Sequence, residues 1–283
     1  MAIHSCGGRP SLALGLVLWA CLAPAGRAAD RPLWEFGLGA GAIAFTDYRG
    51  ADSAHVYPLP VPYFVYRGKL FKADRDGVRG MLIKNPRAEL NVSVDATTPV
   101  SSRNNSARAG MPDLQPTVEF GPSLDVHLWR SQNERLRLDL RIPARKAFTI
   151  ERQPQSVGWF VAPRINFDLR DIAGHAGWDL GTFIAPLFAD RQYQDYFYSV
   201  APSFATPSRP AYRASGGYAG TELLVAISRR YREFWFGAFL RYDSLAGASF
   251  LDSPLVRSHS YWAGGFGIAR IIGKSQRQVP GDN

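Results

Sequence analysis

The chain is built around segments in which apolar and polar residues alternate with a period of two. The clearest of them is Val157–Arg170. Its apolar row reads Val157, Trp159, Val161, Pro163, Ile165, Phe167 and Leu169, and its second row reads Gly158, Phe160, Ala162, Arg164, Asn166, Asp168 and Arg170. Because successive side chains of a β-strand point to opposite faces, the pattern predicts a strand with one apolar face and one largely polar face.

Similar patterns divide most of the chain into candidate strands. They span 33–45, 55–67, 69–84, 87–95, 117–129, 134–144, 157–170, 175–189, 212–230, 233–243 and 259–272. These are eleven segments, whereas bacterial outer-membrane barrels have an even number of strands. The conflict disappears if 69–84 divides at Asp74-Arg75-Asp76-Gly77, if Tyr193–Val200 is a separate strand, or if two segments merge. We expect about twelve strands, with about ten as the alternative.

The predicted fold class is all-β, and two architectures fit the alternation. A transmembrane antiparallel β-barrel turns the apolar rows to lipid, whereas a soluble lipocalin-like barrel or β-sandwich turns them inward with the same period. Trp and Tyr near the strand ends, the large number of strands, and the mixture of short and long connections favour the membrane barrel. The aromatic residues concerned are Trp34, Tyr63, Trp129, Trp159, Tyr242 and Trp262.

The first 28 residues have the pattern of a signal peptide. Arg9 precedes the apolar run Leu12–Leu22, which is shorter than the roughly 20 residues that a membrane-spanning helix needs. Small residues at Gly26-Arg27-Ala28 provide a cleavage site, with Ala23-Pro24-Ala25 as a second. A buried core helix and a lipoprotein signal ending at Cys21 are the other interpretations.

Removal of this leader leaves a single predicted barrel domain, residues 29–283, with a polar C-terminal tail at 273–283. Both cysteines, Cys6 and Cys21, lie in the leader. The predicted mature chain therefore has no disulfide, no catalytic thiol and no cysteine-based metal site. We expect export to the outer membrane of a Gram-negative cell.

The chain is basic, but its charge does not indicate nucleic-acid binding. It has 33 Lys and Arg against 24 Asp and Glu, and subtracting the two leader arginines leaves 31 − 24 = +7. These residues are spread over the alternating strands and form no basic patch. Anionic lipid headgroups, anionic cell-wall polymer or an arginine-lined lumen are the better partners.

The polar rows supply the candidate functional residues, which we expect to face the lumen. They are Arg87, Glu89, Arg135, Arg137, Asp139, Arg141, Arg164, Asp168 and Arg170. A ring of arginines would favour anions in a pore. In a narrow barrel, however, long side chains of mixed sign can also pair and fill the interior. We favour the ion-paired plug over the open pore.

Three prolines at Pro58, Pro60 and Pro62 share one face of the second candidate strand. Because proline has no N–H, one edge of this strand cannot donate a continuous ladder of hydrogen bonds. A bend, a bulge or a rim segment is the favoured interpretation, and a polyproline-type surface that docks a partner is the alternative.

Evidence for catalysis is sparse. Ser258-His259-Ser260 is a candidate for lipid hydrolysis, but neighbouring residues of a strand point to opposite faces and cannot form a nucleophile–base pair without a bend. His127 shares a polar face with Asp125. The sequence contains no His-x-x-x-His pattern and no recognised phosphate-binding loop, so we expect no enzyme, metal or cofactor.

Several pieces of the chain resemble the MipA/OmpV family of MltA-interacting outer-membrane proteins. They are Thr46-Asp47-Tyr48-Arg49-Gly50, the run from Pro58 to Gly68, Asp74-Arg75-Asp76-Gly77-Val78-Arg79-Gly80, Arg108–Asp113, Asp190-Arg191-Gln192-Tyr193, and Leu240–Phe250 followed by Asp252–Val256. The pieces keep the family order along nearly all of the predicted mature chain. The chain departs from the usual barrel ending, because its C-terminus is not aromatic.

The resemblance implies an outer-membrane barrel that scaffolds a murein-degrading lytic transglycosylase and a murein synthase. It implies no catalytic residues. A narrow passive anion-preferring channel is the first alternative function, and a lipid-modifying outer-membrane enzyme is the second. Outer-membrane lipid is expected to surround the barrel in each case.

Overall fold

The computed structural model describes residues 31–279, apart from 69–70, 75–76 and 134. The strands are β1 (Arg31–Pro32), β2 (Trp34–Thr46), β3 (Ala54–Arg67), β4 (Phe71–Asp74), β5 (Gly77–Lys84), β6 (Ala88–Ala96), β7 (Thr117–Arg130), β8 (Leu136–Thr149), β9 (Ser156–Val161), β10 (Arg164–Arg170), β11 (Trp178–Ala189), β12 (Gly217–Tyr231), β13 (Phe234–Ser244), β14 (Ser260–Lys274) and β15 (Gln278–Val279). The α-helix is α1 (Arg191–Tyr198), and the 3₁₀ turns are η1 (Ser102–Asn104), η2 (Ser106–Arg108), η3 (Ile172–Gly174) and η4 (Pro202–Phe204). The predicted leader lies outside the described residues.

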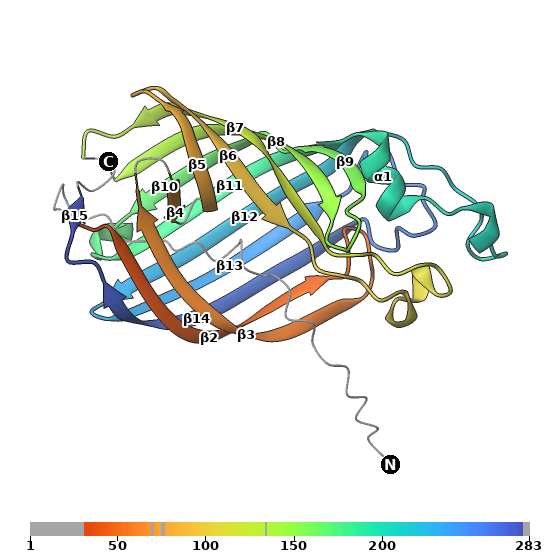
Figure 1. Cartoon of the computed structure of the whole chain (residues 1–283), viewed down its shortest axis with the longest axis horizontal. Coiled ribbons are helices and arrows are strands. Elements are labelled where there is room, and N and C mark those ends of the chain that lie inside the picture. Colours follow the sequence, from red (N-terminus) through yellow and green to blue (C-terminus); the bar gives the residue numbers. More distant parts are fainter. Residues whose placement is uncertain (1–30, 69–70, 75–76, 134, 280–283) are drawn as a thin grey trace, which may run out of the picture.

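The strands from β2 to β14 form one closed antiparallel ring (Figure 1). Sequential neighbours pair from β2 to β8, and β14 returns to pair with β2. The short strands β9 and β10 together occupy one place, because each pairs with both β8 and β11. The barrel therefore has 12 strands, which confirms the prediction.

The extra strand comes from the division of 69–84. Here β4 and β5 form a hairpin, with Asp74 opposite Gly77, and the turn residues 75–76 lie outside the described part. The alternative strand at Tyr193–Val200 is wrong, because this segment is mostly α1. The carboxylate of Asp190 caps that helix by accepting a hydrogen bond from the Tyr193 N–H at 2.8 Å.

The segment Val157–Arg170 does not form the single strand that its alternation predicts. It is divided between β9 and β10, with Pro163 in the break. Gly158 has a φ of 126°, which an L side chain rarely adopts, and the faces change there. Trp159 and Ile165 are exposed on the outer surface as expected, but Val157 is only 2% exposed and packs in an interior cluster.

Side-chain exposure shows that the barrel is apolar outside and polar inside. On β14 the outer residues Trp262, Phe266 and Ile272 are each at least 60% exposed. In contrast, the residues Asp139 and Asp243 are 1% and 0% exposed. A soluble barrel would have the reverse distribution, so the lipocalin-like alternative is excluded.

The two ends of the barrel differ (Figure 1). The connections at one end are short: 68–70, 85–87, 131–135, 171–177 and 232–233. At the other end, the long connections 97–116, 190–216 and 245–259 carry α1 and the 3₁₀ turns η1, η2 and η4. In outer-membrane barrels the short turns face the periplasm and the long loops face outward.

The first and last described strands meet at the short-turn end. β1 pairs with β15, and the Leu33 N–H donates to the Arg277 carbonyl at 2.8 Å. The predicted polar tail therefore starts later than expected: 273–274 belong to β14 and 278–279 to β15, while 280–283 lie outside the described residues. Within the described residues, no helix is long and apolar enough to cross a membrane.

Candidate functional site

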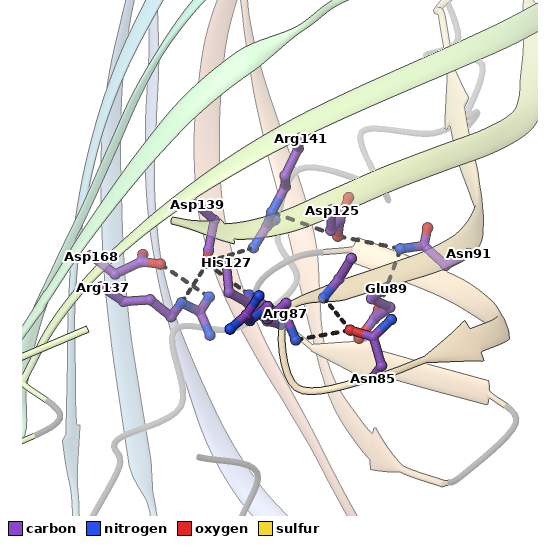
Figure 2. A network of polar contacts seen from close by, with 11 residues as sticks. Asn85, Arg87, Glu89, Asn91, Asp125, His127, Arg137, Asp139, Arg141 and Asp168 are labelled. Atoms are coloured by element: carbon purple, nitrogen blue, oxygen red, sulfur yellow. Dashed lines mark hydrogen bonds and ion pairs between the residues drawn. The ribbon is translucent and has the colours of Figure 1, made fainter. Parts of the chain in front are cut away.

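A network of polar contacts in the barrel interior is centred on Asp139 of β8 (Figure 2). One carboxylate oxygen of Asp139 lies 2.8 Å from His127 Nδ1, and the other lies 2.7 Å from Arg137 Nε. Arg137 also reaches Asp168 at 3.1 Å, and Arg141 lies 3.7 Å from Asp125. Opposite charges thus alternate across β7, β8 and β10.

The network continues onto β6 through an amide. Asn91 donates to Glu89 at 3.3 Å and to Asp125 at 3.2 Å, and Glu89 lies 3.2 Å from Arg79 Nε. Ser123 donates to Asp125 at 2.8 Å. Each of these carboxylates therefore has a donor or a cation beside it, as a buried charge requires.

A second network lies under the long loops. The Asp243 carboxylate, which is fully buried, accepts from Arg49 Nε at 3.0 Å and from Arg241 Nε at 2.8 Å. Arg49 comes from the loop after β2, and its Nη1 donates to the Ala219 carbonyl at 2.6 Å. Arg49 thus ties a loop to the inner wall at β12 and β13.

A third network holds α1 to the barrel. The Tyr193 hydroxyl donates to Glu119 at 2.8 Å, and Arg145 lies 3.3 Å from Glu119 and 3.2 Å from Asp95. Burial, together with the Glu119 carboxylate, raises the pKa of Tyr193 well above the ordinary phenol value.

The long loops form an apolar cap over this end of the barrel. Its core contains Tyr48, Val100, Ala107, Leu114, Val157, Phe197, Tyr198, Val200, Leu245, Phe250 and Leu255. The rings of Tyr198 and Phe250 stack with centroids 3.6 Å apart. Tyr48 donates to the Leu255 carbonyl at 2.7 Å, and Tyr198 donates to the Arg49 carbonyl at 2.9 Å. Burial raises the pKa of both phenols.

A fourth cluster lies at the short-turn end. Glu35, which is 1% exposed, lies 3.0 Å from Arg67 and 2.7 Å from Arg230. Arg67 also donates to the Pro32 carbonyl at 2.7 Å, so the cluster holds β1 against the barrel.

The structure brings together Glu89, Arg137, Asp139, Arg141 and Asp168 of the predicted residues. Arg164 is opposite Arg141 in the register of β8 and β10, and its guanidinium lies 5.0 Å from the Phe183 ring. Arg170 is opposite Asp179 in the register of β10 and β11.

Two predicted residues lie at the short-turn rim, and Figure 2 draws one of them, Arg87, beside the central network. Arg87 is exposed in the turn before β6, and Arg135 is 51% exposed before β8, where it lies 3.9 Å from Asp171. Both are at the rim because the strands begin after them, at Ala88 and Leu136.

Sequence reasoning missed Glu35, Arg49, Glu119, Arg145 and Asp243 as network members. Glu119 and Asp243 belong to alternating rows, so the same period-two signal could have identified them. Arg49 belongs to a loop, and no strand pattern predicts that it folds back into the barrel.

The candidate catalytic residues form no recognisable hydrolase arrangement. His259 is exposed, and the Ser258 hydroxyl donates to the Ser260 carbonyl, not to the imidazole. His127 contacts Asp139, and the nearby Ser123 hydroxyl is bound to Asp125. Among the described residues no group of three or more His, Cys, Asp and Glu side chains could hold a metal ion.

A closed antiparallel barrel with lipid-facing apolar residues and buried charges defines an outer-membrane β-barrel protein. The family described as MltA-interacting protein MipA matches residues 38–272. The chain belongs to this family, as the sequence resemblance predicted. Among curated proteins, none matches this chain.

Solved outer-membrane proteins are similar to the chain at low identity. Outer membrane phospholipase A from Escherichia coli is 12% identical, with 84% of this chain and 93% of that chain covered and a TM-score of 0.32. The toluene transporter TbuX of Ralstonia pickettii is 9% identical (90% and 72% covered, TM-score 0.27), and the toluene transporter TodX of P. putida is 11% identical (90% and 69% covered, TM-score 0.27). At these values the likeness says nothing about function.

Proposed function

We propose that this protein is a non-enzymatic outer-membrane scaffold that joins murein-degrading and murein-synthesising enzymes at the periplasmic face. The observation that carries the proposal is the double closure of the barrel. The ion-pair network around Asp139 joins β7, β8 and β10 inside the barrel, and the apolar cap packs the long loops together at one end. A barrel closed in this way acts through its surface.

The rim of short turns is the surface that the proposal assigns to soluble partners. Arg87, Arg135 and Arg232 are exposed there, as are Glu233 and Arg277. The family description names an interaction with MltA, which supports a murein-degrading partner.

A retention assay with the purified, detergent-solubilised protein tests the scaffold. We expect it to retain a lytic transglycosylase of the MltA type and a murein synthase. Reversing two rim charges, Arg87→Glu with Arg135→Glu, should weaken retention about tenfold, corresponding to about 1.4 kcal/mol. The matched control is Arg103→Glu with Arg257→Glu, which reverses two exposed charges at the opposite end. No retention of either enzyme by the unaltered protein contradicts the scaffold.

Planar-bilayer recording tests the closed interior separately. The arginines of the central network are held by carboxylates, so we expect no steady conductance. Discrete anion-selective steps would instead establish the narrow channel that is the alternative function.

A further inference from the structure

Most of strand β3 has a paired neighbour on one side only. We call its unpaired edge, over residues 54–62, the seam. β3 pairs with β2 along its length, from Ala54 opposite Thr46 to Tyr66 opposite Trp34. On its other side, β3 pairs with β4 only at Tyr66 and Arg67. Over residues 54–62, β2 is the single strand partner of β3 in the described part of the chain. Figure 1 shows β3 and the strands β5 and β6 passing on opposite sides of the resulting seam.

The backbone nitrogens of the three prolines of β3 lie on the edge of the strand that borders this seam. The ladder with β2 continues without a register shift through Pro58, Pro60 and Pro62. Backbone nitrogens at alternate positions point to the same side of a strand, so donors to β2 must come from the residues between the prolines, such as Leu59. The proline nitrogens therefore point away from β2, and the pairing with β2 contains no bulge.

The missing N–H donors of the prolines limit which molecules can lie against this edge of β3. An unsatisfied N–H is costly in hydrocarbon, and proline has none. An added β-strand would need donors as well as acceptors along the edge, and between Val56 and Phe64 these positions supply only carbonyl acceptors. The edge thus exposes fewer unpaired polar groups to hydrocarbon than an ordinary strand edge does, and it is unsuited to a second β-strand.

The inner face of β3 is more exposed beside the seam than near β4. Its side chains alternate in burial along the strand, and the inward positions Tyr57 and Leu59 are only partly buried. Towards the short-turn end of the same face, Val61, Tyr63 and Val65 are 4%, 0% and 1% exposed. The lower three pack in a cluster with Trp235, Ala269 and Ile271, which forms an apolar floor.

The partly exposed inner surface is aromatic and aliphatic apart from His55, whose ring centroid lies 6.0 Å from that of Tyr57 and which pairs with Asp47 at 3.1 Å. The ring of Phe45 on β2 stacks on Tyr57 with centroids 5.1 Å apart, and Leu59 is the next inward residue. The ion-pair networks described above include Arg67 near the short-turn end of β3, but none of their contacts described here involves Tyr57 or Leu59.

We propose that the seam above β4 is a lateral port through which an acyl chain of a bilayer lipid enters the upper barrel and packs on Phe45, Tyr57 and Leu59. The cluster of Val61, Tyr63 and Trp235 stops the chain below, so the port is a binding recess and not a passage to the periplasm. This inference does not depend on the scaffold function.

Paramagnetic relaxation from lipid tests the port. Single-cysteine variants in a Cys6→Ser, Cys21→Ser background receive a small trifluoromethyl tag and are placed in phosphatidylcholine vesicles whose acyl chains carry a nitroxide. Tyr57→Cys is the inward test position, and its outward neighbour Val56→Cys calibrates contact with lipid at that depth. On β12, inward Ala226→Cys and outward Val225→Cys form the matched control pair, and Ala226 lies in the same register row as Tyr57.

Fluorine signals should broaden strongly at both outward positions and weakly at Ala226. Broadening at Tyr57 that approaches the value at Val56 supports the port. The broadening at Tyr57 is divided by that at Val56, and the broadening at Ala226 by that at Val225. A Tyr57 ratio no greater than the Ala226 ratio overturns the port. Unchanged mobility of the unheated variants in gels containing SDS verifies that each barrel is folded.

Discussion

Single residues in this barrel act as junctions between charges of opposite sign. Asp139 joins His127, Arg137 and Arg141, and Asp243 joins Arg49 and Arg241. Burying such pairs need not stabilise a protein strongly, but removing one partner leaves an uncompensated charge. The interior therefore tolerates substitution of a whole pair better than substitution of one member.

Neutralising Asp139 should destabilise the barrel. In Asp139→Asn, Arg137 and Arg141 keep their contacts with Asp168 and Asp125, so we expect the low end of the usual cost, about 3 kcal/mol, in urea unfolding from lipid vesicles. The control Glu233→Gln affects an exposed pair with Arg270, whose side chains are 65% and 64% exposed, and should change stability little. Equal effects of the two substitutions would contradict a structural role for the network.

Small residues on the inner face of β2 allow β2 and β14 to pair closely. A methyl group at Gly39 would overlap the Ile268 carbonyl on β14, whereas a methyl group at Gly80 on β5 would meet no atom within 4 Å. We expect Gly39→Ala to destabilise the barrel by roughly 1–3 kcal/mol and Gly80→Ala to have little effect. Thermal unfolding followed by gel mobility compares the two variants. A stable Gly39→Ala barrel would show that β2 and β14 can move apart.

Among the elements, the cap is built differently from the wall. The wall strands are held by hydrogen-bond ladders, whereas the cap depends on aromatic packing and a few hydroxyl donors from the loops. Tyr198 stacks on Phe250 and donates to the Arg49 carbonyl, so it links α1 to two other loops. The cap should open under conditions that leave the wall intact.

Alkaline pH is such a condition. Burial raises the pKa of Tyr48 and Tyr198 above the ordinary phenol value of about 10. Because the folded cap favours the protonated phenols, its stability is complete below pH 10 and declines as the pH rises above that value. Ultraviolet titration of tyrosinate, together with limited proteolysis of the long loops, should show late ionisation coinciding with cleavage. Titration of every phenol at its ordinary pKa with the loops still protected would contradict this expectation.

For the whole molecule, we propose that the cap and the interior network act as two barriers in series. They use different chemistry, and they lie at different heights in the barrel. Removing one barrier should therefore not open a pathway for solutes.

A swelling assay in vesicles tests the two barriers. Replacing residues 191–198 with a glycine–serine segment of equal length should open the cap but leave the vesicles impermeable to neutral sugars. Adding Arg137→Ala and Asp168→Ala removes a central pair and should produce swelling. Swelling with the cap replacement alone would show that the interior network does not close the barrel.

The sequence by itself determined the class of fold. Period-two alternation predicted the strands, the Asp74–Gly77 turn provided the even strand number, and aromatic residues near strand ends indicated the membrane. Local signals failed where tertiary contacts decide the conformation. Tyr193–Val200 contains enough aromatic residues for a strand but folds as α1, because Asp190 caps it and Glu119 binds Tyr193.

The tertiary structure decided how the charges are used. Alternation placed Arg137, Asp139 and Asp168 on polar faces, but it could not tell whether they line a pore or pair with one another. Pairing depends on the register and curvature that bring β7, β8 and β10 together, and one residue of shift would reverse every face. The same holds for Pro58, Pro60 and Pro62: the sequence showed that one edge of β3 lacks donors, and only the closed ring showed that this edge faces a seam in the wall.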